Sequence, residues 1–390
     1  MTEDYLHFIW GNKRLTHPEL KTSAGDSFQI KYFGSHNMLM AGPDFNHACI
    51  RIDGVELHGP IELHVKSSDW YAHKHQGDRN YDNVILHVVY ENDLQIEQAG
   101  RKIPTFELKP FIDWQHFEKY KSFRDNRHSI VCGKLLEGSD PILLQNMMDK
   151  AYFRKVSQKV DTITQYANSP EEMMYFFLGS AFGSNLNKFP FLELLKVAPA
   201  EKLRKLSPDQ RFQWLIAESG MLDSERKSSE KWHFKGNRPG NFPTKRIHQF
   251  AHLLCDDQLV HLAEFGSSKE IIQTFHEIII HQSKKYSTTL VFREHILINA
   301  VIPYFFYLAI LKQNEKYQDL GLEILEQLKP EKNQITKRWE QVGFKLKNAR
   351  ESQGLLALFR YYCSAKKCVS CEVGNAILKV ENDSKNSLLL

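Results

Sequence analysis

The chain has 390 residues, of which 42% are hydrophobic and 25% are charged, and its formal net charge is +4. This is an ordinary globular composition with enough residues for two domains, each with its own core, and it excludes wholesale disorder. The mild basic balance is compatible with nucleic acid as a partner but does not require one, because overall charge says little about a local patch.

The N-terminal sequence MTEDYLHFIW has acidic residues where a signal peptide would have lysine or arginine. No uninterrupted apolar run approaches the roughly 18 residues needed to cross a bilayer. The longest stretch, around residues 296–310, is interrupted by Asn299 and Pro303. We therefore expect a cytoplasmic protein with no membrane segment. In that reducing compartment, clustered cysteines are interpreted first as metal ligands and not as disulfides.

Six elements are predicted in the N-terminal region, in the order α-β-β-β-α-β. A short helix over 2–10 comes first, and β-rich runs follow at 28–33, 47–52 and 61–66. Cap-type residues at 67–69 precede a second helix that ends at 75, and the β-branched run VILHVVY gives a fourth strand at 84–90. A charged and aromatic connector is predicted after this region, at 110–129.

Two acidic residues lie on neighbouring predicted strands. Asp44 precedes the second strand, and Glu62 lies on the third. Alternation along the third strand points Glu62, His64 and Lys66 to one face. The antiparallel return of the chain through the turn at 53–54 brings the two carboxylates together. Two carboxylates beside a basic group form an oxygen-rich site for Mg²⁺ or Mn²⁺.

Asp44, with the proline before it, and Glu62 resemble the motif of the PD-(D/E)xK nuclease superfamily, in which Pro-Asp is followed by an acid, any residue and lysine. His64 stands in the position of that lysine, so His64 or Lys66 would assist the attacking water and the phosphate. The resemblance implies a metal held by Asp44 and Glu62 and hydrolysis of phosphodiester bonds in DNA or RNA. The superfamily often carries a glutamate on its first helix, where Glu3 is the candidate.

Several segments spread along the chain carry a second likeness. They are 42–45, 62–70, 73–75, 81–82, 86–89, 238–243 and the C-terminal cysteine cluster. On these segments the chain resembles, over nearly its whole length, a bacterial protein family of unknown function. This resemblance brings no activity with it, so the expected function depends on the nuclease motif and on the chemistry of its residues.

From Pro141 the pattern changes to apolar residues spaced three and four apart, which predicts helices. The predicted helices are 141–166, 170–182, 191–195, 208–219, 245–254, 269–281, 293–311 and 334–346. The fold class expected is therefore α+β. A restriction-endonuclease-like αβββαβ domain at 1–125 is followed by a mainly α-helical domain at 126–390.

A segment rich in basic and aromatic residues lies at 232–247. Its basic side chains are interleaved with aromatic ones, an arrangement that binds phosphates and stacks on unpaired bases. A purely structural interpretation is also open, with a Pro-Gly turn, a capped helix and aromatic side chains in the core. The candidate nucleic-acid-binding residues are Lys235, Arg238, Lys245 and Arg246.

Three cysteines near the C-terminus follow the spacing C-x4-C-x2-C. Thiolates at this spacing can converge on one metal centre, and both zinc and an iron–sulfur cluster fit it. Cys132 is our choice for a fourth ligand, because a glycine follows it and its neighbours are not those of a helix core. Some members of the nuclease superfamily carry a four-cysteine iron–sulfur cluster, which this plan resembles. The four expected ligands are Cys132, Cys363, Cys368 and Cys371.

Histidines in the N-terminal region offer an alternative metal site. His64 and His87 lie on strands where both can face one pocket, and zinc binds imidazole readily. His73 and His75 are two positions apart on a predicted helix and would not share a face. Two other functions therefore stay open. One is a histidine-based zinc hydrolase of a small substrate, and the other is a nuclease-fold protein that binds nucleic acid or acts in an assembly without cleavage.

Overall fold

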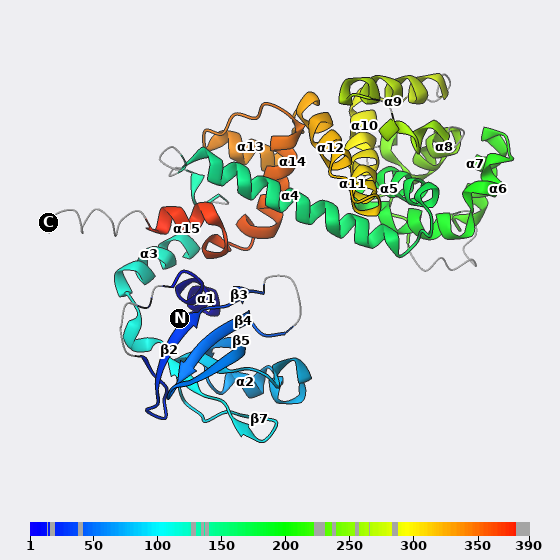
Figure 1. The fold of residues 1–390 in the computed structure, drawn as a ribbon. Coiled ribbons are helices and arrows are strands. Elements are labelled where there is room, and N and C mark those ends of the chain that lie inside the picture. Colours follow the sequence, from blue (N-terminus) through cyan, green and yellow to red (C-terminus); the bar gives the residue numbers. More distant parts are fainter. Residues whose placement is uncertain are drawn as a thin grey trace. The chain divides into compact units, whose positions relative to one another are not determined.

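The computed structural model describes residues 1–13, 15, 20–37, 42–125, 130–133, 136, 140–221, 231–235, 239–253, 257–264, 266–282 and 288–379. The fold is α+β, with a mixed sheet in the N-terminal region followed by a mainly helical region (Figure 1). The chain divides into two compact units, Met1–Met147 with Phe359–Leu390, and Met148–Leu358. We call them unit 1 and unit 2. The predicted division at residue 125 assigned the C-terminal segment to the helical domain, whereas its contacts join it to unit 1.

The described strands of unit 1 form a seven-stranded sheet in the order β1-β2-β4-β5-β6-β9, with β3 paired to β4. Pairing is antiparallel from β1 to β5, and β5, β6 and β9 run parallel. A separate two-stranded sheet joins β7 to β8. The strands are β1 Leu20–Lys21, β2 Ser27–Tyr32, β3 Ser35–His36, β4 Phe45–Ile52, β5 Val55–Lys66, β6 Leu86–Glu91, β7 Glu97–Gln98, β8 Arg101–Lys102 and β9 Thr105–Glu107.

Unit 1 contains the predicted order of helices and strands and has further helices after it. The sequence α1, β2, β4, β5, α2, β6 follows the expected α-β-β-β-α-β pattern, and α1 packs against β5. The connector predicted at 110–129 contains a helix, α3, that the sequence analysis missed. The helices are α1 Glu3–Gly11, α2 Asp69–Ala72, α3 Trp114–Asp125 and α15 Glu372–Lys379, with short turns η1 His75–Gly77, η2 Arg79–Tyr81, η3 Lys109–Phe111, η9 Phe359–Cys363 and η10 Cys368–Ser370.

A bulge in β4 sets which residues of β4 and β5 face each other. Phe45 pairs with Ile61, whereas Ala48 pairs with Gly59, so the register shifts by one residue between them. Continuing the Phe45 register by one position places Asp44 opposite Glu62. Without the bulge, Asp44 would stand opposite the next residue, whose side chain points to the other face.

The C-terminal segment of unit 1 returns to the helices α1 and α3, and Figure 1 shows α15 beside α3. The Lys119 ammonium donates to the carbonyl oxygen of Ile377 at 3.2 Å. A side chain at Gly374 would place its Cβ 2.1 Å from the carbonyl oxygen of Cys368, so this position needs glycine. The cysteine-bearing turn η10 is thereby held tightly against α15.

Unit 2 is built from helices around one large apolar core. The predicted helices at 170–182 and 191–195 are parts of one element, α5, which is kinked where Ser184 and Asn187 leave helical geometry. The elements are α4 Pro141–Thr164, which begins in unit 1, α5 Pro170–Val197, α6 Ala200–Arg204, α7 Pro208–Glu218, η5 Pro239–Asn241, α8 Pro243–Leu253, η6 Asp257–Leu259, η7 Leu262–Glu264, α9 Ser268–Gln282, α10 Leu290–Ile296, η8 Leu297–Val301, α11 Ile302–Leu311, α12 Lys316–Gln327, α13 Gln334–Gln341 and α14 Ala349–Leu358.

One continuous helical run, Leu290–Leu311, is long and apolar enough to cross a membrane, although its sequence suggested an interrupted stretch. Other parts of the protein bury 61% of its apolar window. Core helices of helical domains have the same character, so the run is weak evidence for a membrane segment.

Candidate functional site

The two predicted acidic residues of unit 1 lie together and are held by backbone N–H groups of Asp44 and Leu63. The backbone N–H of Asp44 donates to Glu62 Oε2 at 3.0 Å, and the N–H of Leu63 donates to Asp44 Oδ2 at 2.9 Å. His7 on α1 places Nε2 3.0 Å from the same Asp44 oxygen. Glu62 is buried, and its second oxygen, Oε1, faces a group of imidazole rings.

The surroundings of Glu62 and Glu3 disfavour the ionised form of their carboxyl groups. Burial, and next the charge of Asp44, raise the pKa of Glu62 to about 9. Burial also raises the pKa of Glu3, which lies within electrostatic range of His73, His7 and Asp44. Burial opposes protonation of His7, but the hydrogen bond to Asp44 and its charge outweigh it and raise the pKa of His7. The site therefore carries acidic groups whose ionised form needs a neighbouring cation.

Three imidazoles lie close together, and two of them lie beside Glu62. His64 Nε2 lies 3.5 Å from Glu62 Oε1 and 3.1 Å from His73 Nδ1. His75 Nε2 lies 3.3 Å from Glu62 Oε1. One ring nitrogen from each of the three histidines lies within 4.8 Å of the other two. Because His64 is buried and His73 is exposed, this histidine group opens to solvent on the His73 side.

The backbone between His73 and His75 explains why both rings reach one point. Helix α2 ends at Ala72, and Lys74 has a left-handed conformation with φ of 65° before the turn η1 begins. This conformation redirects the chain, so the two rings converge although they would diverge on a continuous helix. On the continuous helix predicted over 69–75, these two side chains would have pointed to different faces and could not have met.

Buried aromatic side chains fix the orientation of the rings. His64 Nδ1 and His87 Nε2 are hydrogen-bonded at 2.8 Å, as expected from their neighbouring strands. Trp70 is fully buried and packs edge-on against His64, His75 and His87. Tyr81 stacks on His75 with ring centroids 3.9 Å apart. Burial lowers the pKa of His64 to about 2 and that of His87 to about 3, so both rings are neutral.

Lys66 differs in position from the other predicted catalytic residues. It lies at the exposed end of β5, where its backbone N–H donates to Asp69 Oδ2 at 2.9 Å. Asp44, Glu62 and His64 come together, as the strand pattern predicted, and Glu3 on α1 lies within electrostatic range of Asp44. The functional residues that the sequence analysis missed are His7, His73 and His75, and the spacing of Glu3 and His7 on one helix face was the available signal for the first.

The four predicted cysteine ligands also come together in unit 1. Burial raises the pKa of Cys132 to about 12 and that of Cys368 to about 11, and it raises that of Cys363 as well. The charge of neighbouring thiolates adds to each shift, and Cys363 is within electrostatic range of the other three. All four are free thiols. Cys255, another of the six cysteines of the chain, lies outside the described residues.

The basic segment of unit 2 is divided between exposed and buried residues. Lys235 and Lys245 are exposed, and Arg238 lies outside the described residues. Arg246 is buried, and its guanidinium donates to Asn241 Oδ1 at 2.6 Å and to a glutamine on the same helix. Arg246 thus stabilises the fold around α8, in line with the structural interpretation of this segment.

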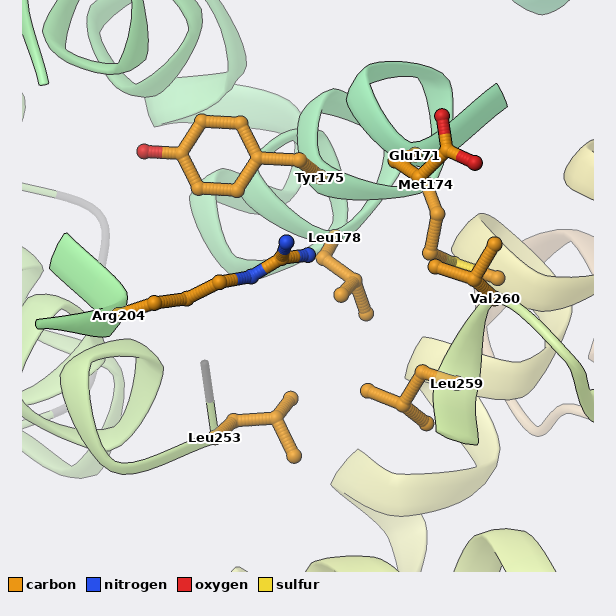
Figure 2. A pocket seen from close by; sticks show the side chains of 8 residues that line it. All are labelled: Glu171, Met174, Tyr175, Leu178, Arg204, Leu253, Leu259 and Val260. Atoms are coloured by element: carbon orange, nitrogen blue, oxygen red, sulfur yellow. The ribbon is translucent and has the colours of Figure 1, made fainter. Parts of the chain in front are cut away.

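Figure 2 shows a pocket in unit 2 whose lining is mainly apolar. The Arg204 side chain extends across it toward Leu178, and the Tyr175 hydroxyl donates to the carbonyl oxygen of Ala198. None of the metal-donor groups found in the described part of the chain lines this pocket. It offers a small apolar hollow without an evident reactive group.

The chain matches, over residues 3–228 and 209–334, the family described as "Protein of unknown function (DUF2851)". These ranges cover most of the chain, so the protein belongs to that family. Searches of curated proteins and of solved structures found no match. The family assignment confirms the resemblance to a family of unknown function, and it carries no activity.

Proposed function

We propose that this DUF2851 protein hydrolyses phosphodiester bonds in DNA or RNA with a divalent metal ion bound beside Glu62. The observation that carries the proposal is the pair of Asp44 and Glu62, in which Asp44 is partly exposed and Glu62 is buried with two imidazoles beside it. A buried carboxylate is costly to ionise without a cation, and a bound metal ion supplies one. Phosphodiester hydrolysis is a principal chemistry of metal ions in such settings.

The order of elements in unit 1 supports a restriction-endonuclease-like fold. A helix, three antiparallel strands, a short helix and a parallel strand follow each other, and the strands are neighbours in this order. Asp44 enters the second of these strands and Glu62 lies on the third, as the nuclease motif requires. Glu3 on α1 would add a third carboxylate to Asp44 and Glu62. The order of the elements is thus a second argument for a nuclease.

The donor atoms decide which of the two expected ions fits. Mg²⁺ binds almost exclusively through oxygen. At this site one carboxylate oxygen lies beside two ring nitrogens, and a third imidazole lies next to one of them. This set does not fit Mg²⁺ and suits Mn²⁺ or another transition metal. We therefore assign no part of the hydrolysis to Mg²⁺.

The roles proposed for His64 and Lys66 follow from their surroundings. His64 Nε2 is enclosed by Glu62 and His73, so this ring is not available to take a proton from water. Lys66 is exposed at the end of the same strand, where its ammonium is available to a substrate phosphate. We assign the phosphate contact to Lys66, and the exposed Lys235 and Lys245 of unit 2 are further candidates for nucleic-acid contact.

A second candidate function is hydrolysis of a small substrate by zinc. Convergence of His64, His73 and His75 favours it, because three imidazoles are a common zinc ligand set in hydrolases. The same centre would then act without nucleic acid, and the exposed lysines would have no role in binding.

We also propose that the four cysteines hold an iron–sulfur cluster in a cytoplasmic protein. A zinc ion bound at about 2.3 Å would hold neighbouring sulfurs about 3.8 Å apart. The described donor groups that lie within 4.8 Å of one another do not include these thiols. Their wider spacing, together with their mutual electrostatic coupling, favours a cluster of several metal ions.

The proposed function predicts Mn²⁺-dependent cleavage of nucleic acid by the full-length protein. Single- and double-stranded DNA, RNA, bis(p-nitrophenyl) phosphate and p-nitrophenyl acetate should be tested with Mn²⁺, Zn²⁺ and Mg²⁺ separately. We expect cleavage of a polynucleotide and of the phosphodiester with Mn²⁺. Hydrolysis of the acetate ester alone would support the small-substrate hydrolase. Binding of nucleic acid with no cleavage under any metal would instead identify a non-catalytic protein.

A further inference from the structure

We infer that three imidazoles in unit 1, beside the Glu62 carboxylate, bind a first-row transition-metal ion of the Mn²⁺, Fe²⁺ or Zn²⁺ class. This inference deepens the proposed function and rests on it for the claim that a cation binds beside Glu62. It differs from the site expected from the sequence, where two carboxylates held Mg²⁺ or Mn²⁺. The three ligands are His64, His73 and His75, and Glu62 Oε1 lies beside His64 and His75.

The distances between donor atoms match those around a single ion. An ion bound at roughly 2.0–2.2 Å separates neighbouring ligand atoms by about 2.8–3.6 Å in octahedral or tetrahedral geometry. Glu62 Oε1 lies 3.5 Å from His64 Nε2 and 3.3 Å from His75 Nε2. His64 Nε2 lies 3.1 Å from His73 Nδ1. All three separations fall in this range.

Hydrogen bonds alone do not account for this convergence. A ring nitrogen carries either one hydrogen or one lone pair, yet His64 Nε2 has both Glu62 Oε1 and His73 Nδ1 beside it. His75 Nε2 is buried and makes no hydrogen bond within the described part of the chain, although it points at Glu62 Oε1. One cation among the three imidazoles would satisfy their ring nitrogens, and it would lie beside the Glu62 carboxylate.

His87 is placed to orient His64, the most buried of the ligands. A metal-binding histidine usually engages its other ring nitrogen in a hydrogen bond, which fixes the tautomer. His64 Nδ1 and His87 Nε2 are 2.8 Å apart, and in the tautomer with hydrogen on His64 Nδ1, its Nε2 presents a lone pair to the site. Trp70 and Tyr81 pack against these rings and their neighbours, so the ligand geometry is built into the core of unit 1.

The site also provides access and open coordination positions. His73 is exposed, so an ion and a substrate can enter from its side. Three protein ligands leave three positions open on an ion with six ligands, such as Mn²⁺ or Fe²⁺. Imidazole ligands favour these ions and Zn²⁺ over Mg²⁺, so excess Mg²⁺ should not displace the bound ion.

Another donor group, on β4 and β5, provides a matched control. Cys49, Glu56 and His58 also lie within 4.8 Å of one another, but the Glu56 carboxylate is paired with Arg51 at 3.0 Å. The His58 side chain is 70% exposed and has no buried aromatic support of the kind that Trp70 gives His64. His58→Ala therefore removes an imidazole from the same strand without touching the inferred ligands.

The test is metal stoichiometry of the full-length protein, which does not depend on activity. Wild type, His73→Ala, His75→Ala and His58→Ala would be stripped with chelator and titrated with Zn²⁺ or Mn²⁺ in excess Mg²⁺. Bound metal would be measured by mass spectrometry after gel filtration, with circular dichroism to confirm folding. His73 is exposed, so His73→Ala should fold even if a more buried variant does not. Any metal on the cysteines contributes equally to all four proteins.

We expect wild type and His58→Ala to bind one more ion per chain than His73→Ala and His75→Ala. His87→Ala should retain the site with an affinity lowered by about 10- to 100-fold. Unchanged stoichiometry in both His73→Ala and His75→Ala, or displacement of the ion by Mg²⁺, would overturn the inference. If the metal binds as expected but no substrate is cleaved, the nuclease proposal is overturned and the metal site stands. If Mg²⁺ supports cleavage and this cleavage survives His73→Ala, the inferred metal site is overturned.

Discussion

Glu62→Ala is expected to lower metal-dependent cleavage by at least about 100-fold, because an ion that stabilises the transition state contributes several kcal/mol. Glu62 presents Oε1 to His64 and His75 and Oε2 to the backbone of Asp44, so its removal takes away the carboxylate beside the bound ion and a link between β4 and β5. Initial rates on the polynucleotide substrate, measured at saturating Mn²⁺, check this result. Asp44→Ala should abolish cleavage as well, since Asp44 holds the Leu63 N–H and His7.

The control for both variants is Glu56→Ala. Glu56 lies on β5, six positions before Glu62, and is exposed near Arg51. Its loss should leave the cleavage rate within about twofold of wild type, because exposed ion pairs contribute little. Full activity in Glu62→Ala, with circular dichroism showing a folded protein, would remove Glu62 from the reaction.

Serine at Cys363, Cys368 or Cys371 is expected to lower bound metal and melting temperature together. The binding free energy of a structural thiolate centre is part of the folding free energy. A loss of about 3 kcal/mol corresponds to a fall in Tm of roughly 6–12 °C for a domain of this size. The effect should be strong here because the cysteines connect the C-terminal segment to the rest of unit 1, where η10 contacts α1 and α3. Cys132→Ser should behave in the same way.

Metal analysis, visible spectra and melting curves of anaerobically purified protein check this prediction. Cys49→Ser is the matched control, because Cys49 is a buried thiol of unit 1 that lies on β4. This variant should keep the metal and shift Tm by only a few degrees. An iron–sulfur cluster would give visible absorption, whereas zinc would give none. A Cys363→Ser protein with unchanged metal content and Tm would rule out the four-thiol centre.

The strands and their order could be predicted because β-branched runs and turn residues mark them directly. β4 and β6 lie within two residues of their predicted ranges, whereas β5 begins at Val55, six residues before the predicted start at 61. The helix α3 was missed because its sequence, WQHFEKYKSFRD, buries only three side chains in a mostly charged segment. The grouping of Phe359–Leu390 with unit 1 was missed because a contact between distant segments leaves no local pattern.

The acidic half of the candidate site could also be predicted, but its histidine half could not. Strand alternation places Glu62 and His64 on one face, and the two are indeed neighbours. His73 and His75 converge only because Lys74 adopts a left-handed conformation. Glycine or asparagine at this position would have indicated such a conformation, but lysine does not. The pairing of Asp44 with Glu62 likewise depends on a bulge that shifts the register by one residue.

The most direct test of the metal site is an anomalous difference map from crystals grown with Mn²⁺ or Zn²⁺. Data collected above and below the absorption edge locate the ion independently of any assay. We predict a peak within about 2.0–2.3 Å of ring nitrogens from His64, His73 and His75. A map with no peak at these three side chains, or with a peak bound only by Asp44 and Glu62, would contradict the account.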